Sequence, residues 1–446
     1  MKLLLMTYEC SPYQGSEWAA GWGRVLGAAK VAETHVVTSQ ANQAALAQAR
    51  AEGLLPANVF VYAPVPDAEL QRLERKRVLF AYNYRAYHHW QVLALKLVKQ
   101  LHAREKFDLV HQVNVCTFRE PGYGWQLDIP MLWGPVGGTQ NFPGRFLPML
   151  SPMEAAKEGL RTLANWLALR NSRVREAAQH AAVVFAANST NRRDLANAFD
   201  REVELLLETG LHEVTEPDRT RFEKRIANAR SADPLRILWS GELQTRKALP
   251  ILLRALAQLP IEVRWQLDVL GDGPLRGRWS QETEKLGLSD RVRFLGRLPF
   301  AEAVAAMRAA ELFCFTSLRD TSGNVVLEAL AAGVPVLCFD HQGAGDMVSD
   351  FCGIKLPVDS PQRAYGDWAQ AIQALASDPR RLFAFSRGAT VQARHFLWSR
   401  NHDRINAVYR RLSAQQTQQP FPGDAEAYDG NKLLNASIGS VSGSPR

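Results

Sequence analysis

Apolar and polar positions alternate in blocks along the chain. In the first half, six short runs rich in apolar and β-branched residues are each followed by a longer stretch with helical periodicity. These runs cover residues 2–8, 34–39, 59–64, 108–113, 130–136 and 181–187. Apolar strands that alternate with amphipathic helices predict a parallel sheet covered by helices on both faces.

The same rhythm returns in the second half, after a polar, charge-mixed stretch at 212–234. Its apolar runs cover residues 235–240, 265–271, 292–296, 311–317, 334–339 and 353–357. The pattern predicts two doubly wound α/β domains, 1–211 and 235–395, joined by a linker over 212–234 and facing each other across a cleft. Ligands of such sheets bind beyond the carboxyl ends of the strands, so the loops there are the candidate binding loops.

The C-terminal region changes character at two points. Residues 396–412 start with the aromatic Trp398 and carry an apolar face through Ile405, Val408 and Tyr409, which predicts a last helix. Residues 413–446 are rich in Gln, Ser, Gly and Pro and have no apolar periodicity, so a disordered tail is expected there.

Composition narrows the class of protein. The 446 residues are 46% hydrophobic and 22% charged, as in soluble globular proteins. The net charge of +8 favours phosphate-bearing ligands or an anionic membrane surface, but no block of like charge indicates nucleic-acid binding. The five cysteines form no CxxC pair, which favours buried thiols in a reducing compartment. The first apolar run stops at Tyr8, too early for a signal peptide, so a cytoplasmic location is expected.

The stretch TSLRDTSGNVVLEALAAG, residues 316–333, combines a loop acid with a helix acid. Ser322 or Thr321 is expected to cap a helix that ends at Gly333. The backbone N–H groups at its start would form an anion pocket suited to a diphosphate. The residues concerned are Gly323, Asn324 and Val325.

Two interpretations of the acids in this stretch, Asp320 and Glu328, remain open on spacing alone. They would accept hydrogen bonds from hydroxyl-rich groups, such as ribose and hexose, on either side of the phosphates. Alternatively, Asp320 only caps the helix and Glu328 only faces solvent.

The same stretch resembles a known signature. Retaining family 4 glycosyltransferases of the GT-B fold carry S-x-x-E, seven residues, then E-A-x-A-x-G-x-P-V, and this chain reads S-L-R-D, seven residues, then E-A-L-A-A-G-V-P-V. The resemblance implies that the first acid contacts the donor sugar and the second binds the nucleotide ribose. The first acid is here Asp320 in place of Glu, which leaves the sugar contact open.

A second landmark of this family is G-R-L-x-x-x-K-G, whose Arg and Lys clamp the diphosphate. The chain reads SGELQTRKAL at 240–249, so the resemblance implies that Arg246 and Lys247 hold the diphosphate after the turn at Gly241. Glu242 stands at the family's Arg position and Ala248 at its last Gly. The alternative is that both cations are solvated charges at a helix start. LGDGP at 270–274 resembles a further glycine turn, with Gly271 and Gly273 beside the base.

Three loops of the first domain resemble family loops less specifically. YECSPYQGSEW, residues 8–18, offers Gly15 and Ser16 for close approach to the donor, and its Glu17 fits a helix-start acid better than a catalyst. FDLVHQVNVCTFREP, residues 107–121, supplies His111 as a pocket histidine or, equally, as a buried structural one. WGPVGGTQNFP, residues 133–143, places Gly137 and Gly138 in a cleft loop or in a plain tight turn.

The resemblance spans about residues 1–412 and implies that the last helix crosses back onto the first domain. It implies a retaining, metal-independent transfer of a hexose from a UDP- or GDP-sugar to a glycan or lipid-linked acceptor, in cell-surface polysaccharide or glycolipid biosynthesis. Neither a cofactor nor a metal is expected, and no protein base is nominated because the leaving phosphate takes the acceptor proton. Glu242 and Asp320 motivate an alternative, a catalytically impaired GT-B scaffold; a nucleotide-sugar epimerase fits the motif order less well.

Residues 72–106 combine basic and aromatic side chains. This stretch is either a peripheral contact with the inner face of a membrane or a crossover helix with a solvated basic face and a buried aromatic stripe, and the second interpretation is favoured. The residues in question are Arg75, Lys76, Arg77, Phe80, Tyr84, Arg85, Tyr87, Trp90, Lys96, Lys99 and Arg104.

Overall fold

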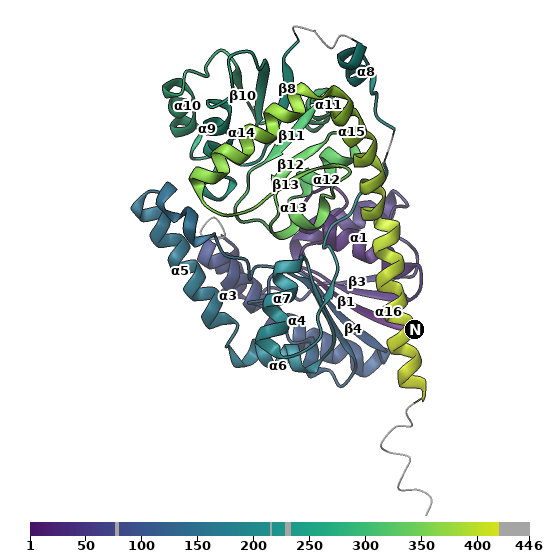
Figure 1. The fold of residues 1–446 in the computed structure, drawn as a ribbon. Helices are drawn as coiled ribbons and strands as arrows, with labels where there is room; N and C mark the ends of the chain where they lie inside the picture. Colours follow the sequence, from purple (N-terminus) through teal and green to yellow (C-terminus); the bar gives the residue numbers. More distant parts are fainter. Residues whose placement is uncertain (76–79, 215, 228–232, 419–446) are drawn as a thin grey trace, which may run out of the picture.

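The computed structural model describes residues 1–75, 80–214, 216–227 and 233–418 and contains two α/β domains, one above the other (Figure 1). The first domain has a seven-stranded parallel sheet in the order β3-β2-β1-β4-β5-β6-β7. Its strands are β1 Lys2–Thr7, β2 Glu33–Val37, β3 Val59–Tyr62, β4 Leu109–Asn114, β5 Met131–Val136, β6 Ala181–Ala186 and β7 Glu204–Leu205. Its helices are α1 Glu17–Ala29, α2 Gln43–Ala51, α3 Ala68–Arg75, α4 Phe80–Glu105, α5 Pro152–Ala168, α6 Ser172–His180 and α7 Ser189–Phe199.

The second domain repeats the architecture with a six-stranded parallel sheet in the order β10-β9-β8-β11-β12-β13. Its strands are β8 Leu235–Ser240, β9 Trp265–Leu270, β10 Val292–Gly296, β11 Leu312–Phe315, β12 Val336–Phe339 and β13 Gly353–Leu356. The helices are α8 Thr220–Ala227, α9 Leu249–Leu256, α10 Arg276–Lys285, α11 Phe300–Ala309, α12 Asn324–Ala331, α13 Gln342–Met347, α14 Pro361–Ser377, α15 Pro379–Ala393 and α16 Trp398–Gln418. Short 3-10 turns are η1 Gln40–Asn42, η2 Gly124–Gln126, η3 Gly144–Met149, η4 Thr245–Lys247 and η5 Arg394–Phe396.

The central strands are buried on both faces. In β1, Leu4 and Met6 belong to one hydrophobic core and Leu3 and Leu5 to another, because successive side chains of a strand point to opposite sides. The continuous apolar runs in the sequence are therefore confirmed as strands covered by helices on both sides. The two-residue β7 has no such run and was not predicted.

The stretch expected to be a linker contains a helix of the second domain. Helix α8 packs on α15, and its Phe222 is fully buried in the same core as Leu235 and Ile237. The polar composition of 212–234 gave no sign that Phe222 would be buried.

Helix α16 crosses back and packs against the first domain, running down beside α1 in Figure 1. Two glycines of α1 make room for it: a Cβ on Gly23 would lie 2.6 Å from the Trp398 ring, and one on Gly27 would lie 2.4 Å from the His402 ring. The helix continues through residues 413–418, which were expected to be disordered. Residues 419–446, the rest of that expected tail, lie outside the described residues.

Helix α4 is a crossover helix, as favoured from the sequence. Tyr87 and Trp90 are buried, and both rings pack near Tyr8. Its basic side chains at 85, 96, 99 and 104 face solvent. Lys76 and Arg77 lie outside the described residues. Within the described part of the chain, no helix is long and apolar enough to cross a membrane.

Candidate active site at the interdomain cleft

Two cations and one carboxylate meet at the carboxyl end of the second sheet. The guanidinium of Arg246 lies 3.0 Å from the carboxylate of Asp320, and the Lys247 ammonium also forms an ion pair with it. Burial lowers the pKa of Lys247. Burial alone would raise the pKa of Asp320, but Lys247 and Arg246 outweigh it and lower this pKa. The two cations are thus held together in a partly desolvated position.

The turn η4 that carries these cations is fixed to the loop after β11. The Thr316 hydroxyl donates to the Lys247 carbonyl at 2.7 Å, and the Leu318 N–H donates to the Arg246 carbonyl at 2.9 Å. The chain then reverses through Ala248, whose φ of 48° lies in the left-handed region. Ala248 stands at the position where the resembled motif carries glycine, the residue that adopts such a φ without strain.

The N-terminus of α12 is open beside the ion cluster. Gly323, with φ 75°, is the N-cap, and no side chain caps the helix, so the predicted caps at 321 and 322 are wrong. A Cβ on Gly323 would lie 2.8 Å from the Phe315 ring. The backbone N–H groups of residues 323–325 have no acceptor among the described residues. An anion could therefore use these N–H groups.

Glu328 projects from the first turns of α12 and keeps contact with solvent. Surrounding protein partly desolvates its carboxylate, which raises its pKa. Among the described residues its side chain has no hydrogen-bond or ion-pair partner. A helix acid held without a partner is available to accept hydrogen bonds, and its contact with a nucleotide ribose stays a prediction.

A groove of about 310 Å³ lies at the ends of β8 and β9, and Gly241 and Gly271 line it together with Glu242. Gly271 has φ 120°, and a Cβ there would lie 2.0 Å from the Gly241 carbonyl oxygen. A Cβ on Gly273 would lie 2.6 Å from the Leu243 carbonyl oxygen. Because Gly271 and Gly273 have no side chain, their loop can pack directly against the backbone of the loop that carries Gly241 and Leu243, at the edge of the groove. Glu242 faces solvent at its rim, where Gln244 donates to it at 2.9 Å.

The first domain closes over this site with the loop after β5. A Cβ on Gly137 would lie 2.7 Å from the Thr321 methyl group, and the Gln140 side-chain amide donates to the Thr321 hydroxyl at 2.7 Å. Gly138 has φ 95°, a conformation that favours glycine. The loop therefore lies in the cleft, as one of the two interpretations of its sequence predicted.

Two partly buried carboxyl groups in the cleft were not predicted as site residues. Glu17 accepts the Cys116 N–H at 3.0 Å, and Glu208 accepts the hydroxyl of Ser322 from the other domain. Burial raises the pKa of each to about 7, and each is affected by the charge of the other or of Asp320. Glu17 is the first residue of α1, as expected from the sequence, and Glu208 belongs to no motif.

The loop before Glu17 is exposed at the cleft edge. Gly15 has no atom within 4 Å of a Cβ position, and Ser16 adopts φ 58°. A left-handed serine is uncommon and costs about 1 kcal/mol or more. Both residues are exposed, and their close approach to the donor stays a prediction.

His111 does not belong to the site. It is fully buried in β4, where Nδ1 accepts from the Tyr409 hydroxyl and Nε2 donates to the Gly134 carbonyl, both at 2.6 Å. Burial and the nearby Arg24 lower its pKa to about 3, so the ring is neutral. The predicted catalytic role is wrong, and His111 instead anchors α16 to the first sheet.

Helix α5 bridges the two domains. Its Glu158 pairs with Arg319 through two contacts of 2.8 and 3.1 Å. Its Glu154 lies 3.1 Å from Arg278 and also accepts the Thr245 hydroxyl. These contacts place the cation-bearing turn η4 and the loop after β11 against the first domain.

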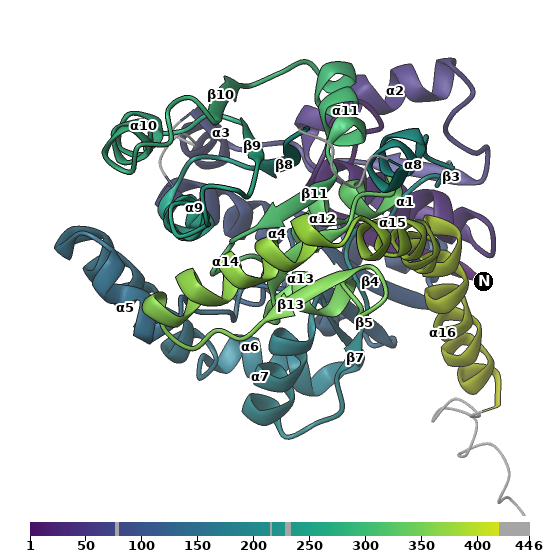
Figure 2. The same cartoon turned by 45° about the horizontal axis from the view of Figure 1, so that its top comes forward.

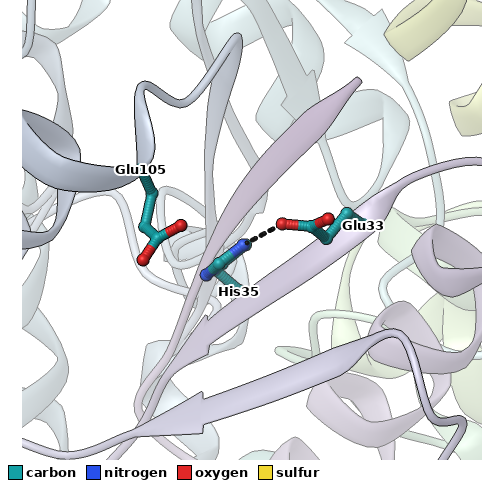
Figure 3. A group of neighbouring side chains, drawn as sticks. All are labelled: Glu33, His35 and Glu105. Carbon is teal, nitrogen blue, oxygen red and sulfur yellow. Dashed lines mark hydrogen bonds and ion pairs between the residues drawn. The ribbon is translucent and has the colours of Figure 1, made fainter.

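In the described part of the chain, three possible metal ligands lie close together in one group (Figure 3). It combines Glu33 and His35 of β2 with Glu105 at the end of α4. The Lys2 ammonium already pairs with both glutamates, at 3.4 and 3.1 Å. This ammonium supplies the positive charge that a bound metal ion would otherwise bring to the two carboxylates.

The chain is similar to known glycosyltransferases over part of its length. Residues 220–390 match the family described as Glycosyl transferases group 1. A D-inositol 3-phosphate glycosyltransferase of Saccharomonospora viridis is 31% identical over 206 residues, which cover 44% of this chain and 47% of the relative. A second, from Catenulispora acidiphila, is 33% identical over 189 residues, 40% of this chain and 44% of the relative. The matched part thus spans about half the length of these relatives.

Solved structures share the whole two-domain fold. HepE of Anabaena in complex with UDP has a TM-score of 0.57 at 19% identity and covers 92% of this chain and 100% of its own. Sucrose-phosphate synthase of Thermosynechococcus elongatus has a TM-score of 0.61 at 18% identity and covers 93% and 99%. The chain thus has the GT-B fold, and its residues 220–390 match the group 1 glycosyltransferase family.

Proposed function

We propose that the protein is a retaining, metal-independent glycosyltransferase that moves a hexose from a UDP- or GDP-sugar to a glycan or lipid-linked acceptor. The observation that carries this proposal is the meeting of Arg246 and Lys247 with the open N-terminus of α12. Two cations and free N–H groups beside a groove form a site for a dianionic diphosphate.

In this proposal the donor diphosphate replaces a carboxylate. Without ligand, Asp320 pairs with both cations. When the diphosphate enters, Arg246 and Lys247 bind its oxygens and Asp320 becomes free to accept hydrogen bonds from sugar hydroxyls. Glu328 would bind the ribose on the other side of the phosphates, and the groove at Gly241 and Gly271 would take the base.

The chemical step breaks the anomeric C–O bond, and the leaving diphosphate keeps the electron pair. The acceptor oxygen attacks the same face of the sugar and passes its proton to the departing phosphate oxygen. The protein contribution is electrostatic: Arg246, Lys247 and the N–H groups of 323–325 stabilise charge as it develops on the diphosphate. The domain contacts at Thr321 and Ser322 would exclude water from the closed cleft.

An acceptor site is offered by a cavity of about 620 Å³ in the first domain. Thr139, Asn141, Asn165 and Asp194 line it with hydroxyl, amide and carboxylate groups, and Trp166 adds an aromatic ring. Such a lining suits the hydroxyls and apolar faces of a glycan. A role in cell-surface polysaccharide or glycolipid assembly at the cytoplasmic side of a membrane would follow.

Nucleotide binding by calorimetry tests this proposal. UDP is the first ligand to use, because HepE, a protein of the same fold, was crystallised with it; GDP is the second. Lys247→Met should weaken binding about 10- to 150-fold, the loss of a charge-assisted hydrogen bond worth about 1.5–3 kcal/mol. Glu328→Gln should also weaken binding. The control is Lys99→Met, at an exposed position of α4, which should leave binding unchanged.

Turnover is then measured as donor hydrolysis over a panel of nucleotide-sugars. Failure of the wild type to bind either nucleotide would overturn the enzyme proposal. Tight nucleotide binding without turnover of any donor or acceptor would favour the alternative of an impaired GT-B scaffold, for which Glu242 and Asp320 are the motivating observations.

A further inference from the structure

Helix α5 turns its apolar side to solvent. Met153, Leu160, Leu163 and Leu167 are 68%, 67%, 52% and 54% exposed. Their spacing of seven, three and four residues places them on one stripe of the helix. On the opposite side, Glu158 and Asn165 are buried. A surface helix normally has the reverse arrangement.

Polar contacts on the inner side fix this orientation. Glu158 holds Arg319 of the second domain, and the Asn165 amide donates to the Thr139 carbonyl at 3.1 Å. Glu154 closes the helix start through a capping box with Ser151. Rotating α5 to bury its leucines would break all of these contacts, so the exposed stripe is a stable feature of the surface.

The outer side of α5 is cationic at its polar positions. Lys157 is exposed within the stripe, and Arg170, just after the helix, stacks on Trp166 at 3.7 Å from the ring centre. The two acids of α5, Glu154 and Glu158, both point inward and are paired. Leucines, a tryptophan and cations without a carboxylate are the features of a helix that lies in a lipid interface.

The position of α5 suits a flat partner. Figures 1 and 2 both show it at the outer edge of the molecule, with no other helix outside it. A planar surface can therefore reach the stripe along the length of the helix.

We propose that the outer face of α5 docks on an anionic lipid bilayer, with the helix axis in the plane of the interface. The docking face consists of Met153, Lys157, Leu160, Leu163, Trp166 and Leu167. This inference does not depend on the proposed glycosyl transfer. It places the membrane contact on α5 instead of on 72–106, and it brings the cavity that Trp166 and Arg170 help to line close to the lipid surface.

Cosedimentation with vesicles tests the docking face. The probe is phosphatidylglycerol mixed with phosphatidylcholine, compared with phosphatidylcholine alone. The triple variant Leu160→Gln/Leu163→Gln/Leu167→Gln should lose at least tenfold in vesicle affinity. A matched triple in the second domain replaces exposed apolar residues that lie off α5: Ile261→Gln, Phe300→Gln and Val391→Gln. This control should bind as the wild type does.

The charge contribution is measured separately. Lys157→Gln/Arg170→Gln, or 0.5 M salt, should reduce binding to the anionic vesicles by several-fold, because both act on electrostatic attraction to the headgroups. Unchanged nucleotide binding in solution by the triple variant would show that the fold and the cleft are intact, so docking and nucleotide binding are tested independently.

Three results would overturn the proposal. One is wild-type protein that does not sediment with anionic vesicles. Another is equal binding by the α5 triple variant and the wild type. The third is a wild-type dimer in light scattering that the α5 triple converts to monomer without loss of vesicle binding, which would assign the stripe to a second copy of the chain.

Discussion

Glu208 gives a quantitative test of the closed cleft. Burial raises its pKa from the ordinary 4.5 to about 7, the charge of Asp320 adds to this, and the hydrogen bond from Ser322 opposes it. One carboxylate oxygen, Oε2, is buried with no hydrogen-bond partner among the described residues. At neutral pH about half of the folded molecules would thus carry a proton on Glu208.

The sign of the effect follows from proton linkage. Between pH 4.5 and 7 the folded state holds this proton more tightly than the unfolded state does, so the contribution to stability is complete below pH 4.5 and is lost as pH rises to 7. A difference of 2.5 pKa units, at about 1.36 kcal/mol per unit, gives a loss of about 3.4 kcal/mol. Because the Glu208 side chain keeps some contact with solvent, 3.4 kcal/mol is an upper bound on the loss of stability.

Glu208→Gln removes the titrating proton and keeps a hydrogen-bond acceptor for Ser322. The variant should be more stable than the wild type at pH 8.5, by up to about 3 kcal/mol, and similar to it near pH 4.5. Urea unfolding from pH 4.5 to 8.5 measures this, with the exposed Glu202→Gln as control. Parallel pH curves for Glu208→Gln and the wild type would refute the reasoning, since the buried carboxyl would then contribute no pH dependence.

Three further substitutions separate structural from binding roles. His111→Gln should lower stability by about 2–3 kcal/mol, because two buried hydrogen bonds are disturbed. Donor hydrolysis per folded molecule should stay unchanged. A hundredfold loss of activity at an unchanged melting temperature would instead show that His111 takes part in catalysis. Gly27→Ala places a Cβ 2.4 Å from the His402 ring and should cost about 1–3 kcal/mol, seen as faster proteolysis of α16; unaltered proteolysis would contradict the packing described. Gly271→Ala, with its Cβ 2.0 Å from the Gly241 carbonyl oxygen, should abolish calorimetric UDP binding, and normal binding would remove the groove from the nucleotide site.

Much of the fold could be predicted because its signals are local. The buried strands are short apolar runs, and their partners in the sheet are other runs of the same kind. The loops that carry the cluster were also predictable, because Arg246 and Lys247 lie in the loop after β8 and Asp320 in the loop after β11, and neighbouring parallel strands end at the same edge of a sheet. The ion pairs themselves were not predicted, because Lys247 and Asp320 are 73 residues apart in the chain.

The role of His111 could not be predicted, because one partner lies far away in the chain. Tyr409 is 298 residues distant, and the contact exists only because α16 folds back onto β4. The local sequence DLVHQV is compatible with both a pocket histidine and a structural histidine. Glu208 is a similar case: burial raises its pKa, and both the Ser322 hydroxyl that it accepts and the Asp320 charge that adds to the shift belong to the other domain.

The sequence by itself determined two α/β sheets and the loops at their carboxyl ends, because these depend on apolar runs and on residues a few positions apart. The tertiary structure alone decided which acids are buried, that His111 is structural and that α5 turns its leucines outward. Periodicity gives α5 two faces, but the direction of each depends on Arg319 and Arg278, which the second domain brings to its polar side.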